Sequence, residues 1–145
     1  MYPSQRHLLM QTFREATRRP FGYLLLMKSR TGPAVSSSTR TTATARCIHW
    51  VAFHFPREGP VEFFDSLGRS PEYYLRRFRN VLIATGPQYR FSTTQVQPGS
   101  SDTCGLYCVH FVKMRYRNIS MEDIVKDFSS RDLMSNDDKL LALYE

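Results

Sequence analysis

Two hydrophobic patterns alternate along this chain and predict its helices and strands. Short runs of β-branched and aromatic residues, bounded by Pro, Gly, Asp or Ser, predict strands, and apolar residues that recur every three or four positions predict helices. Strands are expected at residues 21–27, 47–55, 61–64 and 89–96, and helices at 5–18, 70–83, from 104 onward, 120–128 and 135–143. This order of elements is that of an α/β or α+β domain.

The strands at 47–55 and 61–65 are joined by a link short enough to make them an antiparallel hairpin. Side chains alternate along a strand, so the first strand places His49 on one face and Trp50 on the other. Asp65 closes the second strand, next to a turn. In such a hairpin a strand-end acid can lie beside a histidine on the neighbouring strand and hold one of its ring N–H groups.

Length and composition fit a single domain with a basic, polar N-terminal region. The 145 residues carry a formal net charge of +7. Residues 1–60 hold nine Lys and Arg against two Asp and Glu, whereas residues 61–145 hold eleven of each. This basic region fits either a solvated tail or weak binding to nucleic acid. Within it, residues 31–45 are polar and of low complexity, and we expect them to form a flexible linker.

Three cysteines, Cys47, Cys104 and Cys108, favour reduced thiols. Their number is odd, and the C-x3-C spacing of the last two, without a second Cys or His pair, is poor for zinc. The sequence shows no secretory signal and no apolar run of about 18 residues, so no membrane partner is expected. We expect an intracellular protein, nuclear or cytoplasmic, or a virion component.

Cys104 falls in the first turn of an expected helix, after a turn at residues 98–101. Ser101, Asp102 and Thr103 are all residue types that favour the N-cap position. The unpaired N–H groups and the positive dipole end of a helix start stabilise an anion, which favours the nucleophilic thiolate. Cys104 is therefore a candidate nucleophile, and the alternative is a small buried apolar residue.

A thiolate protease also needs an imidazole that exchanges its proton, a group that orients the imidazole, and donors for the oxyanion. His49 and Asp65 are the candidates for the first two roles. Gln97, just before the Pro-Gly turn, is the candidate oxyanion donor together with the Cys104 backbone N–H, and Gln95 is the alternative donor. Taken singly, each has a plain structural interpretation: a packed strand histidine, a turn-forming acid or a surface amide.

Taken together, these residues resemble the pattern of a known family. The segments that carry the resemblance are HWVAFHF at 49–55, VEFFDSLGR at 61–69 and QVQPGSSDTCGLYCVHF at 95–111. They resemble the adenain-like cysteine proteases, which include the adenovirus maturation protease and its relatives in Maverick/Polinton transposons. More distantly, they are similar to the ubiquitin-like-protein-specific proteases. The glutamine lies seven residues before the cysteine, which is the spacing of the adenain branch.

The resemblance implies an α+β fold with a papain-like/adenain-like core, in which a small mixed sheet packs on a central helix that carries the nucleophile. The implied roles are Cys104 as nucleophile, His49 as general base and acid, Asp65 as its orienter and Gln97 as oxyanion donor. The protease domain is expected at residues 47–145, truncated at its N-terminal side. Residues 1–46 are expected to be a non-family, partly disordered basic segment, because the strand that precedes His-Trp in the family has no counterpart there. A missing neighbour strand would leave an open sheet edge.

The expected function is that of a cysteine-type endopeptidase, a thiol protease that cleaves a capsid-type precursor at a small-residue site such as one containing Gly. One alternative is a deconjugase of SUMO or ubiquitin-like modifiers, and another is an inactive transposon-derived remnant that acts as a binding module. The sequence itself requires no cofactor, whereas the resemblance implies DNA or an activating peptide as candidates. Besides the protein substrate, the expected partner is DNA, bound weakly through the basic N-terminal segment.

Overall fold

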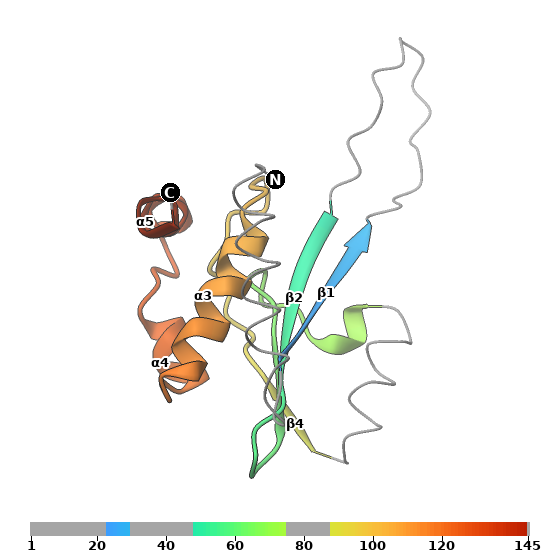
Figure 1. Ribbon diagram of the computed structural model, residues 1–145. Coiled ribbons are helices and arrows are strands. Elements are labelled where there is room, and N and C mark those ends of the chain that lie inside the picture. The colour runs from blue at the N-terminus through green and yellow to red at the C-terminus, as the bar shows by residue number, and fades with distance from the viewer. Residues whose placement is uncertain (1–22, 30–47, 75–87, 145) are drawn as a thin grey trace, which may run out of the picture.

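The computed structural model describes residues 23–29, 48–74 and 88–144 of the chain (Figure 1). In this part of the molecule a four-stranded sheet and three α-helices form a mixed α+β fold. The elements, in chain order, are β1 (Tyr23–Ser29), β2 (Ile48–His54), β3 (Val61–Phe64), the 3-10 turn η1 (Pro71–Tyr73), β4 (Tyr89–Phe91), α3 (Cys104–Tyr116), α4 (Met121–Lys126) and α5 (Leu133–Tyr144).

The sheet has the strand order β1-β2-β3-β4 and combines antiparallel and parallel pairs. β1 pairs antiparallel with β2 along its whole length, from Tyr23 opposite His54 to Ser29 opposite Ile48. β3 pairs antiparallel with β2 over residues 52–54, which is the predicted hairpin, and pairs parallel with β4. Residues 48–51 of β2 therefore extend beyond its ladder with β3, and this part of the strand carries the candidate histidine, His49.

The two faces of the sheet bury different side chains, as the alternation along β2 predicts. One face carries Ala52 and Phe64 and packs against α3, where the rings of Phe64 and Phe111 stack with their centroids 4.7 Å apart. The other face carries a second apolar cluster around Phe53 and Phe63. Figure 1 shows α3, α4 and α5 together on one side of the sheet. The long helix α3 is thus enclosed between the sheet and the later helices.

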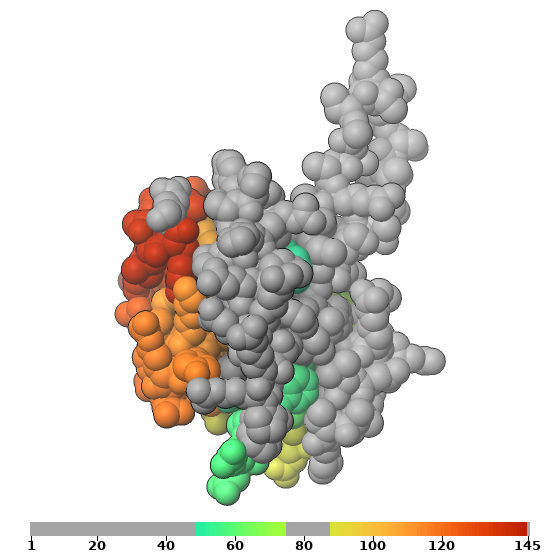
Figure 2. All heavy atoms as spheres, viewed as in Figure 1, coloured from blue at the N-terminus to red at the C-terminus, as the bar shows by residue number. Residues whose placement is uncertain are grey.

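The helix α3 is the central helix of the fold. It begins at Cys104, as the capping residues before it predict, and every residue from Cys104 to Val112 is buried, as in a helix enclosed on all sides. α4 begins at its predicted cap, because the Ser120 hydroxyl accepts the N–H of Asp123. α5 packs against α3 and adds Leu140 to the same core. In the space-filling view of Figure 2, α4 and α5 form the orange and red surface at the left.

The strand β1 supplies a neighbour for β2, so the expectation of an open sheet edge there is wrong. The strand expected at residues 21–27 is found at Tyr23–Ser29 and pairs with all of β2. The sheet thereby takes in residues from the segment 1–46, N-terminal to the boundary expected before residue 47. The helix expected at 5–18, the linker expected at 31–45 and most of the helix expected at 70–83 lie outside the described residues.

Two elements end earlier than expected. The strand expected at 89–96 ends at Phe91, because the chain turns so that the N–H groups of Val96 and Gln97 both bond to the carbonyl of Ser66. The helix expected at 120–128 ends at Lys126.

The last helix begins at Leu133, two residues earlier than expected. The Asp132 side chain accepts the N–H of Ser135, so Asp132 caps the start of this helix.

Gly68 allows the loop after β3 to approach the segment before Gln97. Its φ is +69°, and a β-carbon there would lie 2.7 Å from both the backbone nitrogen of Gln95 and the carbonyl oxygen of Thr93. Both clashes are with backbone, which cannot swing aside as a flexible side chain can. The loop that carries Asp65 is therefore held closely against the loop that carries the candidate oxyanion donor.

We expect Gly68→Ala to lower the free energy of unfolding by more than Gly59→Ala does. Both glycines have positive φ, +69° and +93°, and an alanine at such an angle costs about 1–2 kcal/mol. A β-carbon at Gly59 would meet nothing within 4 Å, so that variant reports backbone strain alone. Urea unfolding measures both losses, and an equal or smaller loss for Gly68→Ala would contradict the close packing of the two loops.

Candidate active site

His49 and Asp65 meet across the β2–β3 hairpin. The register pairs Ala52 with Phe64, and one further step places Asp65 opposite Val51, on the same face as His49 and diagonal to it. His49 Nε2 lies 2.8 Å from Asp65 Oδ1. The hairpin therefore brings the two residues into contact, as its alternation predicts.

The Asp65 carboxylate is fully buried and is held by donors from three residues. Besides the His49 ring, Oδ1 accepts the Leu67 N–H at 2.9 Å, and Oδ2 accepts the Tyr74 hydroxyl. The Tyr74 ring also stacks on the His49 ring, with the centroids 6.1 Å apart and the planes 12° from parallel. Burial and the Asp65 charge raise the pKa of Tyr74 above its ordinary value, so the hydroxyl keeps its proton and remains a donor.

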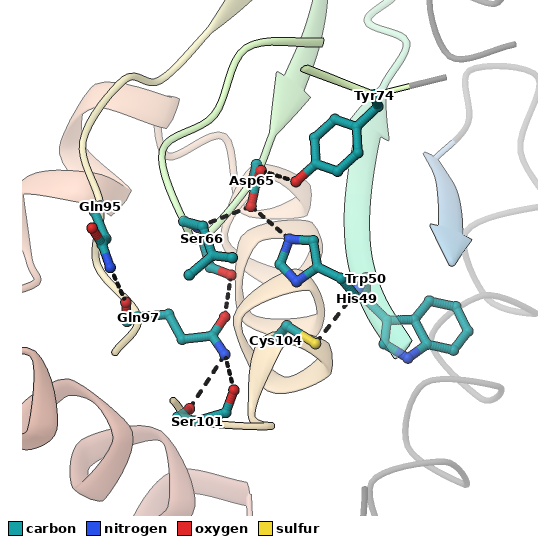
Figure 3. Close-up of polar contacts among 10 residues, drawn as sticks. His49, Trp50, Asp65, Ser66, Tyr74, Gln95, Gln97, Ser101 and Cys104 are labelled. Carbon is teal, nitrogen blue, oxygen red and sulfur yellow. Dashed lines mark hydrogen bonds and ion pairs between the residues drawn. The ribbon is translucent and has the colours of Figure 1, made fainter. Parts of the chain in front are cut away.

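Cys104 is the first residue of α3, and its sulfur lies beside β2. The Trp50 backbone N–H donates to Cys104 Sγ over 3.4 Å (Figure 3). This donor is available because β3 pairs with β2 over residues 52–54, so that ladder does not take up the Trp50 N–H. Thr103 occupies the N-cap position without a side-chain cap bond, and its hydroxyl donates to Asp137 instead. The sulfur therefore has a backbone donor as well as the helix start to stabilise negative charge.

His49 stands between the carboxylate and the sulfur. In Figure 3 one ring nitrogen is bonded to Asp65 and the other is turned toward Cys104. Burial by itself lowers the pKa of His49, but hydrogen bonds to Asp65 and Cys104, with the charges of both groups, raise it to about 9. The ring is therefore charged at neutral pH, and a charged imidazole beside a sulfur stabilises the thiolate.

Gln97 lies in the loop that leads to α3, and both ends of its amide are bonded within the protein. The side chain is buried, and Oε1 accepts the Ser66 hydroxyl. Nε2 donates to the carbonyl oxygen of Ser101 at 2.9 Å and to its hydroxyl oxygen at 3.2 Å. Gln95, the alternative donor, donates from its Nε2 to the Gln97 carbonyl at 2.9 Å. An oxyanion would therefore have to replace the longer of the two contacts to Ser101.

The structure thus brings together His49, Asp65 and Cys104, and places Gln97 nearby with its donors facing Ser101. Sequence analysis missed two contributors to this arrangement, the Tyr74 side chain and the Trp50 backbone. No spacing rule relates Tyr74, which follows a 3-10 turn, to a strand-end acid. The one signal for it is an aromatic residue with a polar tip close after Asp65 in the chain.

Cys108 lies one turn after Cys104 on α3 and is fully buried. Burial first, and then the negative charges of Cys104 and Asp65, raise the pKa of the Cys108 thiol well above its ordinary value. Cys108 is therefore a neutral core residue beneath the site. Cys47 lies outside the described residues.

The other described histidines belong to the packing of the fold. His54 lies 2.8 Å from Glu62, which Arg115 also contacts at 2.8 Å, and this partly buried cluster ties β2 and β3 to α3. His110 Nδ1 lies 2.9 Å from the Tyr144 hydroxyl, which joins α3 to α5. Burial, together with neighbouring positive side chains, lowers the pKa of His110.

Within residues 23–29, 48–74 and 88–144, no group of three or more His, Cys, Asp and Glu side chains is placed to hold a metal ion. None of the helices described here has the length and apolar character needed to cross a membrane. Comparison of the chain with protein-family models and with curated proteins finds no match. The assignment of a function therefore depends on the geometry of the site and on the sequence motifs.

We expect His49 and His110 to titrate on opposite sides of 6.5, the ordinary histidine pKa. His49 should titrate near pH 9 because Asp65 and Cys104 stabilise its charged form, and His110 below 6.5 because it is buried. Asp65→Asn should lower the pKa of His49 and leave that of His110 unchanged. NMR titration of the ring protons measures both, and a His49 ring that titrates at or below 6.5 would contradict this electrostatic arrangement.

Proposed function

We propose that this chain is a cysteine endopeptidase that hydrolyses peptide bonds of a protein precursor, built on a papain-like/adenain-like core. The observation that carries the proposal is the continuous line from the buried Asp65 carboxylate through the charged His49 ring to the Cys104 sulfur at a helix start. A thiolate, an imidazolium and an orienting carboxylate are the parts that acyl transfer through a thioester requires.

In the proposed reaction the Cys104 thiolate attacks the carbonyl carbon of the scissile peptide bond and forms a carbon–sulfur bond. The carbonyl oxygen takes the negative charge of the tetrahedral intermediate. When the carbon–nitrogen bond breaks, His49 gives its proton to the leaving amine, and a thioester remains on the enzyme. His49, now neutral, takes a proton from water, which attacks the thioester and releases the acid and the thiolate. Asp65 holds the ring in place through both halves of the cycle.

The oxyanion would be stabilised by the Cys104 backbone N–H and the Gln97 amide. The Gln97 nitrogen already lies on the side of the loop that leads into α3, because it donates to Ser101. One of its N–H groups can keep the 2.9 Å bond to the Ser101 carbonyl while the other exchanges the 3.2 Å contact for the substrate oxygen. A donor placed in this way contributes roughly 10²–10³ to the rate of acyl transfer.

The substrate preference follows from the motif around the nucleophile. Gly105, buried directly after Cys104, has no side chain to obstruct the close approach of a substrate backbone. With the family resemblance, this favours a cleavage site with small residues such as Gly in a capsid-type precursor. DNA or an activating peptide remains a proposed cofactor on the resemblance alone. A nuclear, cytoplasmic or virion location is proposed from the odd number of cysteines and their spacing, which favour reduced thiols.

We expect Cys104→Ala to abolish hydrolysis of a Gly-containing peptide while the variant stays folded, because the nucleophile is lost and little volume changes. His49→Ala should lose nearly as much activity. Asp65→Asn should keep activity about a hundredfold above that of Cys104→Ala, since an amide still orients the ring in part. Steady-state hydrolysis, with circular dichroism as the check on folding, measures all three.

The matched control is Cys108→Ala, one turn along the same helix, which should lower stability and retain hydrolysis. Wild-type turnover by Cys104→Ala would overturn the proposal. The alternatives separate on substrates: a deconjugase would release a fluorophore from a ubiquitin-like modifier faster than from a Gly-Gly or Gly-Ala peptide. An inactive binding remnant would turn over neither.

A further inference from the structure

The helix α5 contacts two points of the loop between β4 and α3 through two adjacent side chains. Asn136 and Asp137 are polar, yet only 3% and 6% exposed. Asn136 Nδ2 donates to the carbonyl of Val96, the residue before Gln97, at 2.8 Å. Asp137 Oδ1 accepts the hydroxyl of Thr103, the residue before the nucleophile, at 2.9 Å. One helix therefore holds the part of this loop before Gln97 and the part before Cys104.

From Asp137 the contacts continue as a chain to the Gln97 amide. Thr103 Oγ1 lies 2.6 Å from Ser101 Oγ, and Ser101 Oγ lies 3.2 Å from Gln97 Nε2. Asp137 Oδ1 also accepts the Tyr107 hydroxyl at 2.7 Å, a contact outside this chain. Most of these groups are buried, where a hydrogen bond that is broken is not readily replaced by water.

The carboxylate determines the direction of every hydrogen bond in the chain. An ionised carboxylate can only accept, so the Thr103 hydroxyl proton points to Asp137. The Thr103 oxygen must then accept in its contact with Ser101, which uses the one proton of the Ser101 hydroxyl. The Ser101 oxygen is left as an acceptor, which takes the Thr103 N–H at 3.3 Å and faces the nitrogen of the Gln97 amide, whereas the amide oxygen would be repelled there.

We propose that Asp137 is a positioning residue that, through Thr103 and Ser101, keeps the Gln97 amide turned with its nitrogen toward the helix start. Two further contacts support the same orientation: the Ser66 hydroxyl donates to Gln97 Oε1, and the Ser101 carbonyl accepts from Gln97 Nε2 at 2.9 Å. The consequence for catalysis rests on the proposed function. An amide turned the other way would present an oxygen to the oxyanion and repel it, whereas the orientation seen here presents a donor.

The test uses Thr103→Val, which removes the hydroxyl link and keeps the shape of the side chain. Thr103→Ser restores the link and is the rescue variant. Tyr107→Phe is the matched control, because it removes the other hydroxyl on the same carboxylate, together with its 3.2 Å contact to the Val96 carbonyl, and keeps the contacts from Asp137 through Thr103 and Ser101 to Gln97. Thr103→Val and Tyr107→Phe should lose similar stability, about 1–2 kcal/mol each by loss of one buried hydrogen bond.

With a Gly-containing peptide, kcat of Thr103→Val should fall by about tenfold to a hundredfold, since misplacement of a stabilising group has costs of this order. Binding of a peptide aldehyde, whose adduct with Cys104 carries the tetrahedral oxygen, should weaken in parallel. Alkylation of Cys104 by iodoacetamide, which forms no oxyanion, should keep its rate. Thr103→Ser and Tyr107→Phe should behave as the unmodified chain does in all three assays.

Unchanged kcat in Thr103→Val, or an equal loss of iodoacetamide alkylation, would overturn the positioning role. Absence of hydrolysis by the unmodified chain would instead refute the proposed function. In that case the hydrogen-bond chain from Asp137 to Gln97 is tested by NMR, through hydrogen exchange of the Gln97 side-chain amide. One of its two protons should exchange faster in Thr103→Val than in Tyr107→Phe, and equal exchange would overturn the inference.

Discussion

A buried negative charge with a histidine as its ion-pair partner is the constraint on which the rest of this site depends. Asp65 is fully buried, and among the described residues its ion pair is with His49. A buried carboxylate is tolerated when it is paired and hydrogen-bonded, and removal of one partner of a buried pair costs about 3–5 kcal/mol. The fold therefore holds the imidazole in its charged form. The same charged imidazole that stabilises the buried Asp65 carboxylate also stabilises a thiolate beside the ring.

The geometry of the backbone explains how His49, Asp65 and Cys104 come together. The two-residue period of the hairpin puts His49 and Asp65 on one face of the sheet, and β2 runs past its ladder with β3. The part of β2 beyond this ladder provides the Trp50 N–H for the Cys104 sulfur, and Cys104 is the first residue of α3. The positive φ and missing side chain of Gly68 then bring the acid loop against the glutamine loop.

The parts of the site that the sequence predicts are those governed by local rules. Alternation along a hairpin predicts that His49 and Asp65 share a face, and a run of capping residues predicts a helix start at Cys104. The pairing of β1 with β2 was not predictable in this way, because residues 30–47 separate the strands and edge pairing leaves no local pattern. Tyr74 was missed for the same reason, since its contact with Asp65 depends on how a 3-10 turn folds back.

The hydrogen bonds that connect α5 to Gln97 correspond to no sequence pattern. Asn136 and Asp137 read as polar residues on the exposed face of a terminal helix, and their burial follows from packing against α3 and the preceding loop. Thr103 reads as a helix cap, yet its hydroxyl turns to Asp137 because that carboxylate is the stronger acceptor nearby. Side-chain hydrogen bonds between distant elements are set by the assembled fold.

The most direct test of the central claim is the site at which a limiting amount of a Gly-ending vinyl sulfone peptide labels the chain, read by mass spectrometry. If the carboxylate, the imidazolium and the sulfur act as one unit, the label appears first on Cys104, and its rate falls sharply in His49→Gln. Equal labelling of Cys47, Cys104 and Cys108, or labelling of Cys104 that does not depend on His49, would contradict the account.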